Sequence, residues 1–339
     1  MSLKLGLELP YTEMGDRASL IGLAREAESL GYDAVWCSEL YSFDAFTTLT
    51  QIACETDRIK LGTNIANIYA RTPAMLASTA ASLDQLSGGR LILGIGVSGP
   101  QVIEGWHGVA YDRPLQRTRE TIEIVRRVVA GDRLVHDGTV FSLKQGLKLI
   151  NKPLRPDLPI YVASLGPKNV ELTAEAADGW LPTFFSPGHA AEVFGPALAA
   201  GASKRSPGLG PLEVVPFVPA LAGEVSQARD VLRFAIGFYV GGMGSREKNF
   251  YNTLVRRYGF VEEAERIQEL FLSGDKSAAI AAVPDELVDA VTLAGDETRI
   301  RDGIAAFAAA GASGLVIGPM APDADGRRRT LETIAKANA

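Results

Sequence analysis

The sequence is poor in the residues that bind metal ions or form disulfide bonds. Only two cysteines and three histidines occur among its 339 residues. Cys37 and Cys54 are too few and too far apart for a zinc site or a disulfide framework, and no two histidines have the H-x-x-x-H spacing. We therefore expect no metal centre. The low cysteine content is typical of a protein of the reducing cytoplasm.

An excess of positive charge and a long apolar run are also absent. The formal net charge is −6 and the isoelectric point is about 5.3, which gives no indication of a nucleic-acid surface. No apolar run approaches the ~20 residues of a membrane-spanning helix, and the N-terminus lacks the regions of a signal peptide. We predict a cytoplasmic protein that binds small molecules, with neither nucleic acid nor membrane as a partner.

What the sequence does contain is a regular alternation of strand and helix patterns. Eight short apolar segments fit strands: residues 3–9, 33–37, 59–63, 90–94, 159–163, 179–182, 212–218 and 314–317. Helical patterns separate most of them, and Asp16 is a good N-cap for the first helix. This alternation indicates parallel β/α units. Eight units predict an α/β protein with one (β/α)8 barrel, the TIM-barrel fold, over residues 1–339.

Two segments do not fit the repeating unit. Residues 133–144 alternate around Asp137-Gly138 and predict an antiparallel hairpin outside the barrel. Residues 224–301, between the seventh and eighth strands, predict a mostly helical insertion. We expect this insertion to serve as a lid or as a dimer surface, and a homodimer is plausible.

Chemistry in TIM barrels occurs at the carboxyl ends of the strands. Glu39 stands at such an end, after the second strand, where it is expected to bind a cofactor or to shuttle a proton, although a helix cap or a surface salt bridge is the alternative. Asn64 and Asn67 follow the third strand and either shape the loop or face a ligand. His107, in a long loop after the fourth strand, either lines the pocket or faces solvent.

The stretch Gly94–Gly99 matches the dinucleotide fingerprint G-x-G-x-x-G. The context does not fit, because Pro100 follows and the next helix is expected only from Pro114. We expect that glycine here lets a flat ligand approach the backbone closely. The prediction places Gly96, Val97 and Ser98 at a cofactor rather than in a Rossmann turn.

The stretch Ser164–Asn169 lies between a strand end and a helix start. Free backbone N–H groups and the positive end of a helix dipole favour phosphate there. We predict that phosphate binds at Ser164, Leu165, Gly166, Pro167 and Lys168. The alternative is a plain turn with an exposed lysine.

Several short motifs, in their order and spacing, resemble a known family. They are Trp36-Cys37-Ser38-Glu39, Gly62-Thr63, Arg71-Thr72-Pro73, Gly88-Gly89-Arg90 and Asp178-Gly179-Trp180. Together with the two turns above, they resemble the bacterial luciferase-like flavin and deazaflavin oxidoreductases. Nearly the whole chain is similar to their coenzyme F420-dependent branch, which includes methylenetetrahydromethanopterin reductase and its actinobacterial relatives.

The resemblance implies a (β/α)8 barrel of the luciferase-like type with a reduced deazaflavin in its mouth. The ring would lie against a bulge with a non-prolyl cis peptide, which by residue matching falls between Asn64 and Ile65. Asn67 and Tyr69 would then face the pocket. The family's phosphate-binding amides map to Gly166–Lys168, with Pro167 as a turn former.

The sequence departs from one branch of this family. The F420-dependent sugar-phosphate dehydrogenases carry an acid–histidine pair and a second acid where this chain has Glu39-Leu40 and Val97. Hydride donation to a C=C or C=N acceptor is therefore favoured, with the proton from Glu39, Tyr69, His107 or water. An FMN-dependent monooxygenase using dioxygen and a non-catalytic F420-binding protein are the alternatives.

Overall fold

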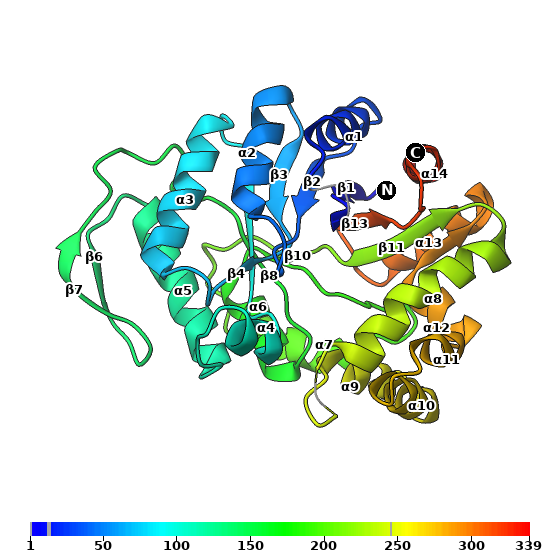
Figure 1. Ribbon diagram of the computed structural model, residues 1–339. Coiled ribbons are helices and arrows are strands. Elements are labelled where there is room, and N and C mark those ends of the chain that lie inside the picture. The colour runs from blue at the N-terminus through cyan, green and yellow to red at the C-terminus, as the bar shows by residue number, and fades with distance from the viewer. Residues whose placement is uncertain (1, 12–14, 245) are drawn as a thin grey trace.

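The structure is a computed structural model that describes residues 2–11, 15–244 and 246–339. Its centre is a ring of parallel strands (Figure 1). In ring order these are β1 (Lys4–Glu8), β2 (Ala34–Cys37), β3 (Lys60–Thr63), β5 (Leu91–Gly96), β8 (Ile160–Val162), β9 (Gly179–Trp180), β10 (Glu213–Val214) continued by β11 (Phe217–Ala222), and β13 (Gly314–Pro319).

The seventh strand closes the ring, although it is broken into β10 and β11. Phe217 pairs with Thr183 on one side and with Val316 on the other. On the same seam, the N–H of Ser313 donates to the carbonyl of Val214 at 2.8 Å. The predicted barrel of eight parallel strand positions is confirmed. The break was not predicted, and β11 continues four residues past the expected end at residue 218.

Helices cover the outside of the barrel (Figure 1). They are α1 (Arg17–Ser29), α2 (Ala45–Glu55), α3 (Pro73–Leu86), α5 (Pro114–Val129), α6 (Pro167–Ala176), α7 (Ala190–Ala202), α13 (Glu297–Ala309) and α14 (Ala324–Asn338). Asp16 caps α1, accepting a hydrogen bond from the N–H of Ser19. Proline occupies the first position of α3, α5 and α6, where its missing N–H has no helical partner to lose.

The barrel interior is filled around the indole of Trp36, which is 2% exposed. Its neighbours in this inner cluster are Ala34, Ile92, Tyr161, Leu181, Val215 and Val316. The strands on both sides of β2 leave room for the ring. A Cβ on Gly6 or on Gly62 would lie only 2.3 Å or 2.1 Å from the atoms of Trp36.

Strands β6 (Leu134–Asp137) and β7 (Ser142–Leu147) pair antiparallel and stand apart from the barrel (Figure 1). The carboxylate of Glu120, on α5, holds the turn between them. It accepts hydrogen bonds from the backbone N–H groups of Thr139, Val140 and Phe141 at 2.8–3.1 Å. The hairpin is thereby attached to the helix beneath it.

The segment between β11 and β13 is mostly helical. It contains α8 (Val225–Gly242), α9 (Phe250–Arg257), α10 (Val261–Leu272), α11 (Lys276–Ala281) and α12 (Asp285–Val291). It also contains a strand that the sequence analysis missed, β12 (Leu293–Gly295), which pairs parallel with β11 outside the barrel ring. Only three residues long, β12 is too short for its period to be recognised. The expected insertion end at residue 301 lies inside α13.

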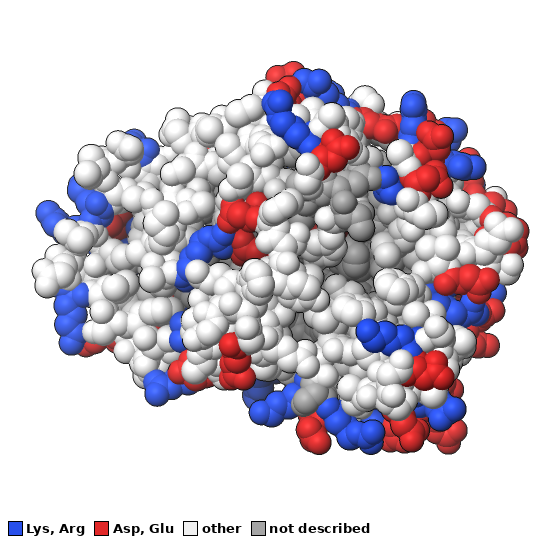
Figure 2. All heavy atoms as spheres, in the orientation of Figure 1, with Lys and Arg blue, Asp and Glu red and all other residues white. Residues whose placement is uncertain are grey.

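None of the helices in the described part of the chain combines the length and the apolar character needed to span a bilayer. Charged side chains of both signs alternate on the face shown in Figure 2, without a large area of one sign.

Candidate active site

A cavity of about 490 Å³ lies at the carboxyl ends of the barrel strands. Residues that end or follow these strands line it: Glu8, Ser38, Glu39, Asn64, Ile65, Gly96, Ala163, Leu181 and Phe217. The predicted residues 97–98 and 164–168 line the same cavity. Ligands of TIM barrels bind at this end, so the cavity is the candidate active site.

The helical insertion forms one wall of this cavity. It contributes Tyr239 from α8, Tyr251 from α9 and, between them, Met243, Gly244, Lys248 and Phe250. The rings of Tyr239 and Tyr251 pack edge to face, with their centroids 4.8 Å apart. We expected a lid or a dimer surface from this insertion but assigned none of these residues to the site, because the local pattern does not show which of them reach the barrel mouth.

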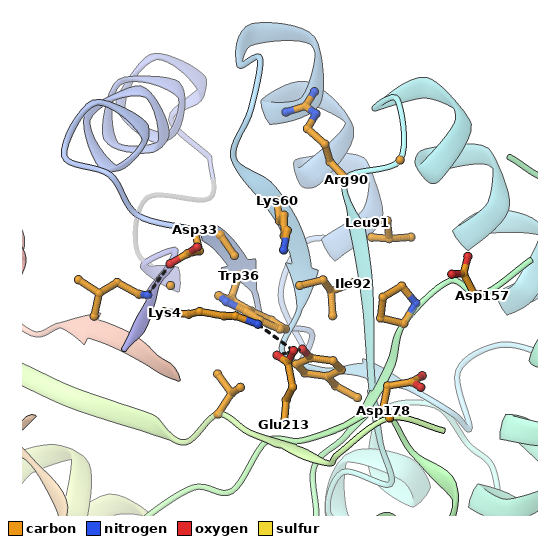
Figure 3. A pocket seen from close by; sticks show the side chains of 18 of the residues that line it. Lys4, Asp33, Trp36, Lys60, Arg90, Leu91, Ile92, Asp157, Asp178 and Glu213 are labelled. Carbon is orange, nitrogen blue, oxygen red and sulfur yellow. Dashed lines mark hydrogen bonds and ion pairs between the residues drawn. The ribbon is translucent and has the colours of Figure 1, made fainter. Parts of the chain in front are cut away.

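A second cavity, of about 360 Å³, lies at the opposite end of the barrel, where the strands begin (Figure 3). Its charged side chains are largely occupied with one another: Lys4 Nζ lies 2.8 Å from a carboxylate oxygen of Glu213, whose other oxygen accepts from the Tyr161 hydroxyl at 2.5 Å. Asp33 accepts from a backbone N–H at 2.9 Å. We assign this cavity to the packing of the amino end of the barrel, where barrels of this type carry no chemistry.

The active-site cavity contains a buried carboxyl group, that of Glu8 at the end of β1. The Ser38 hydroxyl contacts Glu8 Oε1 and lies 2.8 Å from the carbonyl oxygen of Asn64. The side-chain amide of Asn64 donates to Glu8 Oε2 at 2.9 Å. These three residues lie on the adjacent strand positions β1, β2 and β3, and they form one hydrogen-bonded cluster.

Burial raises the pKa of Glu8 to about 7, although hydrogen bonds from Ser38 and Asn64 oppose this effect. Within the described residues, no lysine, arginine or histidine forms an ion pair with it. Tyr239 faces Glu8 from the insertion, and Tyr11 faces it from the end of β1. Near neutral pH this carboxyl group is therefore divided between its protonated and ionised forms, which suits a group that exchanges protons.

Glu8 ends the first strand and is therefore one of the strand-end residues that the barrel rule selects. It was given no chemical role from the sequence, although a signal for one exists. Side chains of a strand alternate between its two faces. Gly6, Trp36 and Gly62 face the barrel interior, so the residues two positions further along each strand, Glu8 and Ser38 among them, must face inward at the mouth. The same alternation along β3, from the inward-facing Gly62, places Asn64, the third member of the cluster, at the mouth.

The peptide bond between Asn64 and Ile65 is cis, as the family resemblance implied. Two glycines of β5 make room for the chain that carries this bond. A Cβ on Gly94 would lie 1.8 Å from the carbonyl oxygen of Thr63, and one on Gly96 would lie 2.8 Å from the Ile65 side chain. We expected these glycines to admit a flat ligand. The structure shows the close approach of the chain that follows β3, and the approach of a flat ligand to Gly96, which lines the cavity, stays a prediction.

Glu39 lines the cavity but is not a free acid. Its carboxylate forms a two-pronged ion pair with Arg71, with both N–O distances at 2.7 Å. Arg71 also contacts Asp44. The backbone N–H of Asn67 donates to Oε2 of Glu39 at 3.1 Å. Glu39 therefore orders the loop after β3, which corresponds more closely to the salt-bridge alternative than to a proton shuttle.

Asn67 and Tyr69 are not among the described residues that line the cavity. Asn67, in the short strand β4 (Ala66–Asn67), is 1% exposed, and its side-chain oxygen accepts from the N–H of Tyr69 at 2.9 Å. The Tyr69 hydroxyl donates to the carbonyl of Asp112 at 2.7 Å. The ring of Tyr69 stacks on Tyr111, which itself lines the cavity. Both predicted residues thus support the wall from behind.

His107 is also absent from the lining of the cavity. It follows the helix α4 (Pro100–Gly105), which the sequence analysis missed. The expectation that no helix begins before Pro114 was therefore wrong: α4 starts directly at Pro100, after Gly99 as its N-cap. The Rossmann interpretation still fails, because this helix is only six residues long. In addition, the preceding strand β5 belongs to a closed barrel rather than to an open sheet.

The start of α6 forms the other end of the cavity. Gly166 is the N-cap and provides no side chain to bond the first turn. In the described chain, the backbone N–H groups of Leu165, Gly166 and Lys168 have no hydrogen-bond acceptor. The Lys168 ammonium group lies 3.0 Å from Glu171 and is largely exposed. This end of the cavity thus offers unpaired N–H donors and the positive pole of a helix.

Comparisons with known proteins identify relatives of this chain. Residues 5–314 match the model of the family described as luciferase-like monooxygenase. A putative coenzyme F420-dependent oxidoreductase of Mycobacterium tuberculosis is 40% identical over 332 residues, which cover 93% of this chain and 94% of that protein. The 5,10-methylenetetrahydromethanopterin reductase of Archaeoglobus fulgidus is 30% identical over 318 residues, 91% of each chain.

Among solved structures, the coenzyme F420-dependent tetrahydromethanopterin reductase of Methanopyrus kandleri superposes with a TM-score of 0.84. The two chains are 25% identical, and the alignment covers 99% of this chain and 98% of the other.

Proposed function

The chain belongs to the luciferase-like monooxygenase family, and we propose that it is an F420-dependent oxidoreductase. It transfers a hydride between C5 of the deazaflavin and a small organic substrate, most readily by reducing a C=C or C=N acceptor. The 40% identity to a putative F420-dependent oxidoreductase supports the cofactor assignment.

One observation of the structure carries the proposal. A single cavity joins a set of unpaired backbone N–H donors at the start of α6 to a buried, titrating carboxyl group at the end of β1. A ligand with a phosphate at one end and a reacting ring at the other matches both features. The phosphate would bind at residues 165–168, and the ring would lie along Ile65 and residues 96–98.

The bound deazaflavin would supply the hydride, and the protein would orient the substrate and control the proton. When a hydride reaches one atom of a C=C or C=N bond, the other atom must take up a proton. Glu8 is the group that we assign to this task, because it is inside the cavity, lacks a counterion among the described residues and has a pKa of about 7.

This assignment revises the proton donors expected from the sequence. Both carboxylate oxygens of Glu39 are held by the Arg71 guanidinium group. The hydroxyl of Tyr69 already donates to a backbone carbonyl, and His107 does not line the cavity. None of the three is as well placed as Glu8.

Titrating the purified protein separately with F420 and with FMN, and following the fluorescence of each, tests the cofactor. We expect F420 to bind with a Kd in the micromolar range or below and FMN to bind at least tenfold more weakly. Preferential binding of FMN would instead favour the monooxygenase. Binding of F420 without reduction of any C=C or C=N substrate would favour a non-catalytic F420-binding protein.

A further inference from the structure

The cluster of Glu8, Ser38 and Asn64 does not contain enough hydrogens to satisfy all its contacts when Glu8 is ionised. A serine hydroxyl has one hydrogen to donate. Ser38 Oγ nevertheless contacts two acceptors, Glu8 Oε1 and the carbonyl oxygen of Asn64. A carbonyl oxygen only accepts. The direction of the bonds must therefore depend on whether Glu8 carries a proton.

When Glu8 is protonated, every contact is satisfied. The carboxyl O–H donates to Ser38 Oγ, and the Ser38 hydroxyl donates to the Asn64 carbonyl at 2.8 Å. The amide of Asn64 donates to Glu8 Oε2 at 2.9 Å. The three groups thus form a closed ring of hydrogen bonds.

When Glu8 is ionised, the same atoms require a different arrangement. The carboxylate has no hydrogen, so the Ser38 hydroxyl turns to donate to it, and a bond to an ionised acceptor is the stronger one. The carbonyl of Asn64 then loses the donor that it has in the other state, and the described residues offer it no other. This carbonyl belongs to the peptide that lines the centre of the cavity.

The groups around the cluster provide no substitute for this hydroxyl. The Tyr11 side chain hydrogen-bonds Ser38 and, like the side chains of Tyr239 and Tyr251 of the insertion, has a pKa raised by burial. Burial, and then the charges of Glu8 and Glu39, also raise the pKa of the neighbouring Cys37 thiol. None of these neighbours is a cation, and both Glu8 and Ser38 are less than a tenth exposed.

We propose that Ser38 is a positioning residue whose hydroxyl reorients between the Asn64 carbonyl and Glu8 as the proton leaves and returns. The carboxyl group thus loses and regains its proton without moving its heavy atoms. This inference rests on the proposed function in one respect: the proton is taken to be delivered to the substrate. The hydrogen-bond switch itself belongs to the protein without ligands.

Titration of Glu8 in the full-length protein, without cofactor, tests this proposal. The carboxyl carbon of Glu8 is followed by NMR in protein labelled with ¹³C-glutamate, and Glu8→Gln identifies its signal. In Ser38→Ala the ionised form loses a charge-assisted hydrogen bond, so we expect the pKa of Glu8 to rise by about one to two units. Ser38→Thr, which keeps a hydroxyl, should restore a value close to that of the unaltered protein.

A matched control is Ser273→Ala, which removes an exposed serine that bonds only its own helix end. It should leave the titration unchanged. If Ser38→Ala does not fold, Ser38→Cys replaces it, and the weaker S–H donor should give a smaller rise. An unchanged or lowered pKa in the folded variant contradicts the proposal, because a merely structural role would affect the melting temperature alone.

This outcome is separate from that of the proposed function. Failure to bind F420 would overturn the cofactor assignment and leave the titration of Glu8 readable. If both hold, the pH at which turnover falls should rise in Ser38→Ala by the same amount as the NMR titration.

Discussion

The side-chain amide nitrogen of Asn64 lies 2.9 Å from Oε2 of Glu8. This contact joins the end of β1 to the end of β3 across the intervening strand β2. It also places a buried carboxyl group against the cis peptide that Asn64 begins. The proton chemistry and the ring-binding surface that we propose thus share one residue.

Replacing Glu8 by glutamine should separate catalysis from binding. The amide keeps the shape of the carboxyl group but has no proton to transfer, so turnover of a C=C or C=N substrate should fall by about 100-fold or more. The affinity for F420 should change little. The exposed Glu262→Gln, on α10, is the control. Turnover within threefold of the unaltered protein would exclude Glu8 as the proton donor.

The same substitution should stabilise the protein at high pH. The pKa of Glu8 is raised from 4.5 to about 7 in the folded state. Below pH 4.5 the group is protonated in both states and costs nothing. Between pH 4.5 and pH 7 the unfolded chain ionises this group while the folded protein keeps it protonated, so the folded protein loses about 3 kcal/mol relative to the unfolded chain, and the loss is complete above pH 7. Urea unfolding at pH 5 and pH 8 should show most of this loss in the unaltered protein and not in Glu8→Gln.

Replacing Glu39 by glutamine should act on structure rather than on proton transfer. It leaves the half-buried Arg71 guanidinium without its two-pronged partner and should lower the free energy of unfolding by about 3 kcal/mol. The pH dependence of turnover should remain that of the unaltered enzyme. Glu55→Gln, which breaks more exposed ion pairs with Arg17 and Arg25, is the control and should cost at most about 1 kcal/mol. A displaced pH profile in Glu39→Gln would argue for a direct catalytic role.

Removing the Lys168 side chain should weaken phosphate binding only slightly. The ammonium group is exposed and paired with Glu171, while the backbone N–H groups of Leu165, Gly166 and Lys168 remain. We expect a loss of about three- to tenfold in F420 affinity for Lys168→Ala, larger at low salt. A deazaflavin that lacks the phosphate should bind both proteins equally. Lys204→Ala is the control, since Lys204 pairs with the same Glu171 outside the cavity.

Glu120 should control the stability of the hairpin at low pH. Burial alone would raise its pKa, but hydrogen bonds from Gln116 and from the turn lower it from 4.5 to about 2. The stabilisation is therefore complete above pH 4.5 and is lost as the pH falls towards 2. In Glu120→Gln, hydrogen exchange at Thr139–Phe141 should accelerate at neutral pH, and F420 binding should not change. Unaltered hydrogen exchange at these residues would show that the turn is stable without the hydrogen bonds to the Glu120 carboxylate.

The barrel and its active end followed from the sequence because strand period, proline-started helices and strand-end polar residues are local features. The alternation of side chains along β1, β2 and β3 even indicates that Glu8, Ser38 and Asn64 all face the barrel mouth. The short elements α4 and β12 were missed because six and three residues show too little of a period.

The sequence by itself determined which strand ends carry carboxylates, amides and glycines. Only the tertiary structure decided which carboxylate lacks an ion pair: Glu39 meets Arg71, 32 residues later in the chain, whereas the hydrogen-bond partners of Glu8 among the described residues are neutral. It also decided that the insertion contributes Tyr239 and Tyr251 to the cavity wall. The physical reason is that the charge state of a buried group depends on neighbours brought from distant parts of the chain, and no local pattern encodes them.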